Sequence, residues 1–140
     1  MKLEDIMIDS EAQSEGRWIR DIPDCDDLEL LVRGLDCAEA SHVRRRRLER
    51  WSQGQRLPEF VIAQGPPQSV RDEALTDALV HVVLRDWRNL TIDGEPVPYS
   101  VEMARRLVAA PENRAFRLAV LWAADLVGKS EAYVARRRAA

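Results

Sequence analysis

The sequence has few of the residues that usually carry catalysis or metal binding. Its 140 residues include two cysteines, two histidines and six glycines. Neither His42 nor His81 has a second histidine or a cysteine at metal-ligand spacing, so no zinc-binding pattern is present. His81 lies beside an apolar stripe, which favours a partly buried structural histidine over a ligand or a base. Gly94 stands alone and Gly65 precedes two prolines, so the glycine-rich phosphate loop is missing as well.

The two cysteines offer little more chemistry. Cys25 and Cys37 are expected to be reduced thiols, because the start of the chain is acidic and resembles no secretory signal. Cys37, in the first turn of a predicted helix, has a position that can lower a thiol pKa. No nucleophile motif surrounds it, and a small packing residue is the favoured interpretation. Carboxylates are scattered, so no acid–base pair can be selected. We therefore expect no enzymatic activity and no cofactor.

Long apolar segments are also missing. The longest apolar run, Leu118 to Ala124, is far shorter than the ~20 residues that a membrane-spanning helix needs. We therefore expect no membrane association, and the two reduced cysteines favour a cytoplasmic location.

Charge is present in quantity but is unevenly distributed. Hydrophobic residues make up 46% and charged residues 32% of the chain, which is typical of a globular domain, and the net charge is only -3. Acidic side chains are concentrated in the first 36 positions, whereas arginines occupy 136–138. Such opposite poles suit head-to-tail contact with a partner or with another copy; the alternative is that both ends only aid solubility. Self-association is therefore expected.

The chain pattern predicts a mainly α protein, a single compact domain of about four helices with a small N-terminal β-hairpin. Apolar residues at helical spacing, capping residues and Gly/Pro breaks mark the helices, and two short aliphatic runs around an Asp-rich turn mark the hairpin. The expected elements are a flexible acidic N-terminus at 1–15 and a domain at 16–138, with the hairpin at 16–34 and helices at about 36–53, 69–90, 100–109 and 111–136.

Four consecutive arginines, Arg44, Arg45, Arg46 and Arg47, are the most conspicuous charge feature. On a helix they point in four directions about 100° apart, so they cannot form one basic stripe. A solvated helix face or a set of clamps for acidic groups of a partner is favoured over nucleic-acid binding. A small helical nucleic-acid-binding regulator that uses this helix remains the alternative function.

The second candidate binding feature combines aromatic residues with a proline-stiffened loop. Trp87 precedes a turn at Asp93-Gly94, and Pro96, Pro98 and Tyr99 follow it. Rigid aromatics beside a preorganised loop lose little entropy on docking, so these four side chains are predicted to bind a protein. The alternative is that Trp87 anchors the core, as is expected of the other tryptophans.

The segment from Leu84 to Ser100 resembles the central signature of tail assembly chaperones from long-tailed bacteriophages, in which a helix with a tryptophan precedes an Asp-Gly turn, two prolines and an aromatic–serine pair. The short runs 16–19 and 30–34 resemble the strands before the first helix of that family. The resemblance implies a helical fold and a protein that keeps the tape-measure protein soluble while tail-tube subunits assemble, and that is missing from the mature virion. A structural head or tail connector is the alternative. The arginine run departs from the family pattern.

Overall fold

The computed structural model describes residues 2–3, 6–54 and 57–129. Within them the chain forms six α-helices and two small sheets. The helices are α1 (Ser10–Glu15), α2 (Ala38–Gly54), α3 (Glu59–Gln64), α4 (Gln68–Ala78), α5 (Val101–Ala109) and α6 (Arg114–Val127). The strands are β1 (Arg17–Ile19), β2 (Glu29–Val32), β3 (Leu84–Arg88), β4 (Thr91–Ile92) and β5 (Glu95–Pro96). A π-helical turn (Leu79–Val83) and a 3-10 turn (Pro111–Asn113) complete the set.

The predicted mainly α fold with a single hairpin is wrong, because the fold is mixed α/β. The antiparallel pair β1–β2 lies within the predicted hairpin, but β3 joins it to make a three-stranded sheet in the order β1-β2-β3. The segments β4 and β5 form a second, two-stranded ribbon around the Asp93-Gly94 turn. Both φ angles of this turn are positive, 52° at Asp93 and 81° at Gly94, as a tight two-residue hairpin requires.

The predicted helix at 69–90 ends early for a physical reason. Helix α4 passes into the π-helical turn, and the chain becomes extended at Leu84, with φ -81° and ψ 116°. Leu84 and Trp87 are three residues apart, a spacing that fits a helix face. The strand accommodates the same spacing because a bulge between Leu31 and Val32 of β2 shifts the register, so that Leu84 pairs with Val32 and Trp87 with Leu30. Pairing with β2 thus overrides the helical pattern.

The other elements lie close to their predicted ranges. Helix α2 begins at Ala38 rather than at about 36, and the 3-10 turn precedes α6 within the predicted last helix. Helix α3 lies between the predicted helices at 36–53 and 69–90, where none was expected. In the N-terminal segment predicted to be flexible, the structure places α1. Residues 130–136 of the last predicted helix and the arginines at 136–138 lie outside the described residues.

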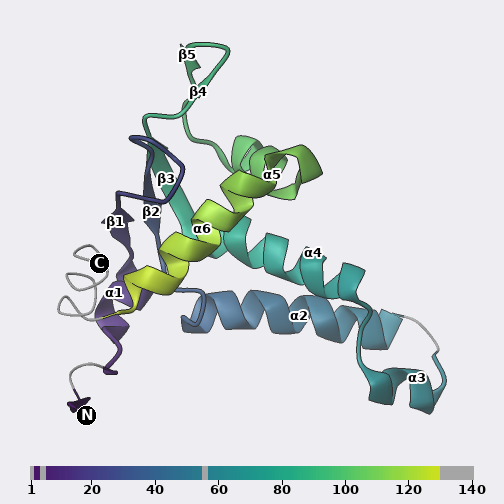
Figure 1. Ribbon diagram of the computed structural model, residues 1–140. Coiled ribbons are helices and arrows are strands. Elements are labelled where there is room, and N and C mark those ends of the chain that lie inside the picture. The colour runs from purple at the N-terminus through teal and green to yellow at the C-terminus, as the bar shows by residue number, and fades with distance from the viewer. Residues whose placement is uncertain (1, 4–5, 55–56, 130–140) are drawn as a thin grey trace.

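The core lies where α6 crosses the three-stranded sheet (Figure 1) and where α5 packs on the π-helical turn. Helices α2 and α4 pack side by side and extend away from the sheet, while the β4–β5 ribbon projects at the opposite end (Figure 1). The largest fully buried side chains come from β2, β3, the π-helical turn, α5 and α6: Leu30, Val32, Leu79, Val80, Val83, Leu84, Val108, Val120 and Val127.

Helix α1 is fixed to this core by its backbone. The Asp9 N–H donates to the Gly128 carbonyl (2.8 Å), and the Gly34 N–H donates to the Gln13 carbonyl (2.9 Å). The Gln13 side chain lies so close to Gly34 that a Cβ there would collide with it. The Asp9 side chain caps α1 by accepting from the Ala12 N–H (3.0 Å). Helix α1 therefore has a defined place at the end of α6.

Candidate protein-binding groove

The aromatic residues predicted to bind a partner are used inside the fold. Trp87 is only 5% exposed, and its Nε1–H donates to the Val97 carbonyl (2.7 Å). Its ring meets those of Tyr99 (centroids 5.0 Å apart) and Phe116 (6.0 Å) edge to face. The Tyr99 hydroxyl donates to the Leu84 carbonyl (3.2 Å), and burial raises the pKa of this phenol. Trp87 and Tyr99 thus fasten the loop after β3 to the core.

The two prolines of the same segment lie at the surface. Pro96 belongs to β5 and Pro98 follows it, and both are exposed. The Ser100 hydroxyl then accepts from the Met103 N–H (3.0 Å) and caps α5, as a serine at this position favours. The structure therefore separates the four predicted residues into two buried or half-buried anchors and two exposed prolines.

The four consecutive arginines of α2 fall into two groups, two that bond within the molecule and two that are exposed. The Arg44 guanidinium donates to the Leu35 carbonyl (3.3 Å) and lies 4.0 Å from Asp36. Arg47 forms an ion pair with Glu73 of α4, and this hydrogen bond raises the arginine pKa further. Arg45 and Arg46 are exposed. Only part of the run is therefore available to a partner, and Arg47 holds α2 against α4.

A groove that sequence reasoning missed lies between α4, α5 and α6 and reaches α2. Its volume is about 970 Å³. Apolar side chains line part of its wall, and one of them, Leu118 of α6, is 51% exposed although it is a large hydrophobic residue. The lining residues are Arg47, Asp72, Glu73, Leu75, Thr76, Asp77, Arg105, Val108, Ala109, Ala110, Pro111, Arg114, Arg117, Leu118 and Leu121. We call this the α4–α6 groove.

Most of the charged side chains that line the α4–α6 groove are arginines, and these differ in the hydrogen bonds and ion pairs that they form. Arg105 forms an ion pair with Asp77 (3.0 Å) and donates to His81 Nε2 (2.9 Å). Arg117 donates to the Thr76 hydroxyl (2.7 Å). Arg114 is exposed, and no carboxylate in the described part of the chain pairs with it.

The positive lining continues from the α4–α6 groove onto α2. A smaller hollow of about 260 Å³ shares Arg47 and Asp77 with the groove and adds Arg46, Arg50 and His81. The two hollows together hold six arginines against three carboxylates. This surface is therefore positive in a chain whose net charge is -3, and it attracts acidic groups.

A model of the YdaY prophage protein family matches residues 36–139, which is most of the chain and includes every element that lines the groove. The chain belongs to this prophage protein family. No curated protein and no solved structure gives a match. The resemblance to tail assembly chaperones is wrong, because the matching family is a different one. The phage origin that it implied is correct at the coarser level of a prophage protein.

The groove could not be predicted from the sequence, because its residues come from four separate helices. Arg114, Arg117, Leu118 and Leu121 did carry a signal, since they recur on one side of α6 at helical spacing. That signal was hidden because residues from Leu118 to Ala124 form a continuous apolar run, which suggests complete burial. Within the described residues no group of histidine, cysteine or carboxylate side chains could hold a metal ion, and no helix has the length and apolarity needed to cross a membrane.

Proposed function

We propose that this prophage protein is a binding protein that holds an acidic, amphipathic segment of a partner protein in the α4–α6 groove. The observation that carries the proposal is that the exposed Leu118 lines the groove together with Arg114, which has no carboxylate partner within the described part of the chain. An apolar anchor next to arginine is the combination that dominates binding energy at protein interfaces. A segment with leucines on one face and carboxylates beside them matches it.

The lining of the groove favours a protein segment over nucleic acid as its ligand. No aromatic side chain lines the groove for stacking on bases, and the exposed Leu118 has no counterpart in a phosphate backbone. A protein segment can place an apolar side chain against Leu118 and a carboxylate against Arg114. An acidic protein segment is therefore the better fit.

The state of the cysteines and of the groove carboxylates fits a binding function better than a catalytic one. Burial and the nearby Asp24 and Asp26 raise the pKa of the Cys25 thiol, which is opposite to the activation that a nucleophile needs. Cys37 is only 4% exposed. In the groove, Glu73 and Asp77 are engaged in ion pairs with arginines, an arrangement that orients charge for recognition. We therefore propose that the protein is not an enzyme.

The finer form of the proposal is a chaperone for phage tail assembly that keeps the tape-measure protein soluble. What supports this role is the groove itself, because a long helical protein with exposed apolar stripes needs such cover before assembly. Several copies along one chain would add their weak contacts through avidity. Membership of the YdaY family supports only the prophage origin of the protein and not this finer role.

The test uses a fluorescent helical peptide with leucines on one face and glutamates on the other. We expect fluorescence anisotropy to show binding that weakens with salt and that is lost when lysines replace the glutamates. Leu118→Ser and Arg114→Glu should each weaken binding by roughly tenfold or more.

Two matched controls change the same chemistry outside the groove. Ile92→Ser removes an exposed isoleucine of the β4–β5 ribbon, and Arg45→Glu reverses an exposed arginine of α2. Both should bind the peptide as the wild type does. Equal losses in controls and groove variants, or tighter binding to a DNA duplex than to the peptide, would overturn the proposal.

A further inference from the structure

We infer that one partner of the α4–α6 groove is a second copy of this chain, which inserts its N-terminal segment, residues 6–15, and so joins copies head to tail. The inference rests on the proposed function of the groove. It adds the identity of the segment that the groove receives and the geometry of the resulting assembly.

Apolar side chains in the N-terminal segment are unusually exposed. Ile6, Met7 and Ile8 are 58%, 53% and 60% exposed, although each is a large hydrophobic residue. Leu3 just before them is 65% exposed. Large apolar side chains gathered in this way mark a surface that another protein covers.

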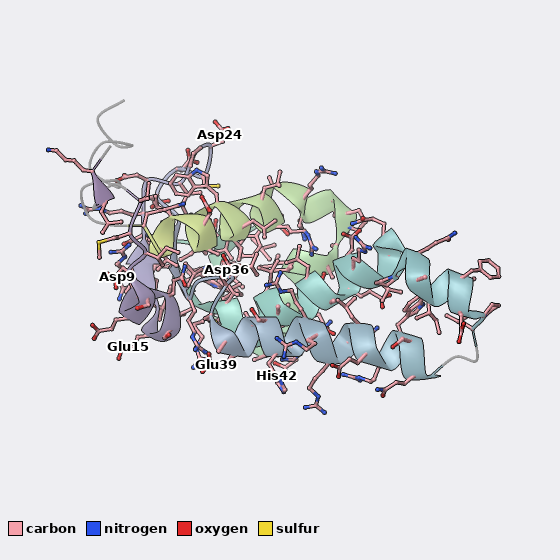
Figure 2. All side chains as sticks on the ribbon, turned by 90° about the horizontal axis from the view of Figure 1, so that it is seen from below. Asp9, Glu15, Asp24, Asp36, Glu39 and His42 are labelled. Atoms are coloured by element: carbon pink, nitrogen blue, oxygen red, sulfur yellow. The ribbon has the colours of Figure 1, made fainter. Side chains whose placement is uncertain are left out.

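Charge in the same segment complements that of the groove. Glu11 and Glu15 of α1 are exposed, and α1 contains no basic residue. Asp9 and Glu15 lie with Asp36 and Glu39 at one end of the molecule (Figure 2). An acidic segment with an apolar edge is the chemistry that the groove selects, and here it is present on the same chain. Arg114, which pairs with no carboxylate among the described residues, is the groove arginine available to such an acidic segment.

The N-terminal segment is presented in a fixed shape. The Asp9 N–H is bonded to the Gly128 carbonyl, Ile8 forms a β-bridge with Lys129, and the Gly34 N–H is bonded to the Gln13 carbonyl. Docking therefore costs little ordering entropy for the backbone of this segment. The apolar side chains remain exposed while the backbone is held.

Within one copy the N-terminal segment is held away from Arg114 while these bonds persist. Arg114 begins α6 and Gly128 follows its end, so the two ends of the helix are ~20 Å apart at 1.5 Å per residue. The segment is fixed at the C-terminal end of α6, whereas Arg114 stands at the N-terminal end of that helix. Contact between the segment of one copy and the groove of the next joins two different surfaces, and such heterologous contacts build chains or closed rings.

The test is sedimentation velocity of the full chain over a range of protein concentration. We expect average mass to rise with concentration and to fall with added salt. Arg114→Glu alone and the double variant Glu11→Lys/Glu15→Lys should each weaken association by roughly tenfold or more. The control Glu49→Lys/Glu95→Lys makes the same change of net charge as the double variant, at exposed positions elsewhere, and should associate as the wild type does.

Mixing the two defective proteins gives the sharpest result. The Arg114→Glu copy keeps a good N-terminal segment, and the Glu11→Lys/Glu15→Lys copy keeps a good groove. These two unchanged surfaces can meet, and the two changed surfaces carry reversed but complementary charges, so the mixture should associate more strongly than either variant alone. A mixture that associates no more strongly than its two components would overturn the head-to-tail arrangement.

The outcomes separate this inference from the proposed function. If the wild type stays monomeric at all concentrations but still binds the acidic peptide, the groove function stands and the second copy is not its partner. If the peptide does not bind either, both proposals fail. If self-association is present, excess acidic peptide should dissociate the assemblies, and assemblies that resist it would show that copies meet at another surface.

Discussion

The surroundings of Trp87 and the α4–α6 groove treat a large hydrophobic side chain in opposite ways: the first buries it and the second leaves it exposed. Trp87 is 5% exposed, makes two edge-to-face ring contacts and has its indole N–H satisfied. Leu118 is 51% exposed and stands among arginines. The first region stabilises the fold, whereas the second leaves apolar area uncovered next to charge. A conspicuous aromatic residue is therefore weaker evidence for a binding surface than an ordinary leucine left exposed in a groove.

The largest expected effect is that of Trp87→Ala. We expect a loss of ~3–5 kcal/mol in the free energy of unfolding, because a buried indole and its packing are removed. Urea unfolding measures the loss. Trp18→Ala is the matched control, since Trp18 is half-buried and covered by the Arg88 guanidinium at 3.7 Å, and it should cost clearly less. Equal losses would contradict the distinction drawn here. If Trp87→Ala does not fold, Trp87→Phe should fold with an intermediate loss.

A smaller effect is expected at the start of α5. Ser100→Ala removes the side-chain acceptor for the Met103 N–H and should cost ~1 kcal/mol. Ser100→Asp keeps an acceptor at the cap and should retain most of the stability. Thermal unfolding distinguishes the two. Identical melting temperatures of the two variants would show that the side-chain cap contributes nothing to stability.

Substitutions of Gly94, in the turn between β4 and β5, should change the free energy of unfolding through backbone conformation alone. Gly94 has φ +81°, and a Cβ added there would meet no atom within 4 Å. Gly94→Ala should therefore cost ~1 kcal/mol through backbone strain. Gly94→Asn should cost less, because asparagine tolerates this conformation. Urea unfolding of the pair tests the explanation, and a larger loss for asparagine would point to crowding.

The smallest effects on stability are expected in the groove. Leu118→Ser and Arg114→Glu should each change the free energy of unfolding by no more than ~0.5 kcal/mol, since both side chains are exposed. A large loss of stability in either variant would place these residues in the fold rather than in a binding surface. Circular dichroism during thermal unfolding gives the comparison with Trp87→Ala directly.

Local signals in the sequence predicted some elements and misled on others. The Ser100 cap and the apolar pattern after it predicted α5 to within a residue, and the two aliphatic runs predicted the β1–β2 pair. These elements depend on neighbours in the sequence. Strand β3 could not be recognised, because its spacing also fits a helix and the deciding contact is its pairing with β2, more than fifty residues away.

The candidate site was harder to predict than the fold. Arg44, Arg45, Arg46 and Arg47 attracted notice as a run, yet two of them are engaged within the molecule. The groove brings Arg47 together with side chains of α4, α5 and α6. Such an arrangement depends on helix packing, which no local pattern reports. The identity of the family likewise came from the chain as a whole and not from the Trp87 segment.

The most direct test of the central claim is the affinity of the acidic amphipathic peptide for the wild type, for Arg114→Glu and for Ile92→Ser, measured by anisotropy alongside thermal unfolding. The account predicts that Arg114→Glu loses most of the binding, that Ile92→Ser retains it, and that all three proteins unfold at nearly the same temperature. Unchanged peptide binding by a folded Arg114→Glu protein would contradict it.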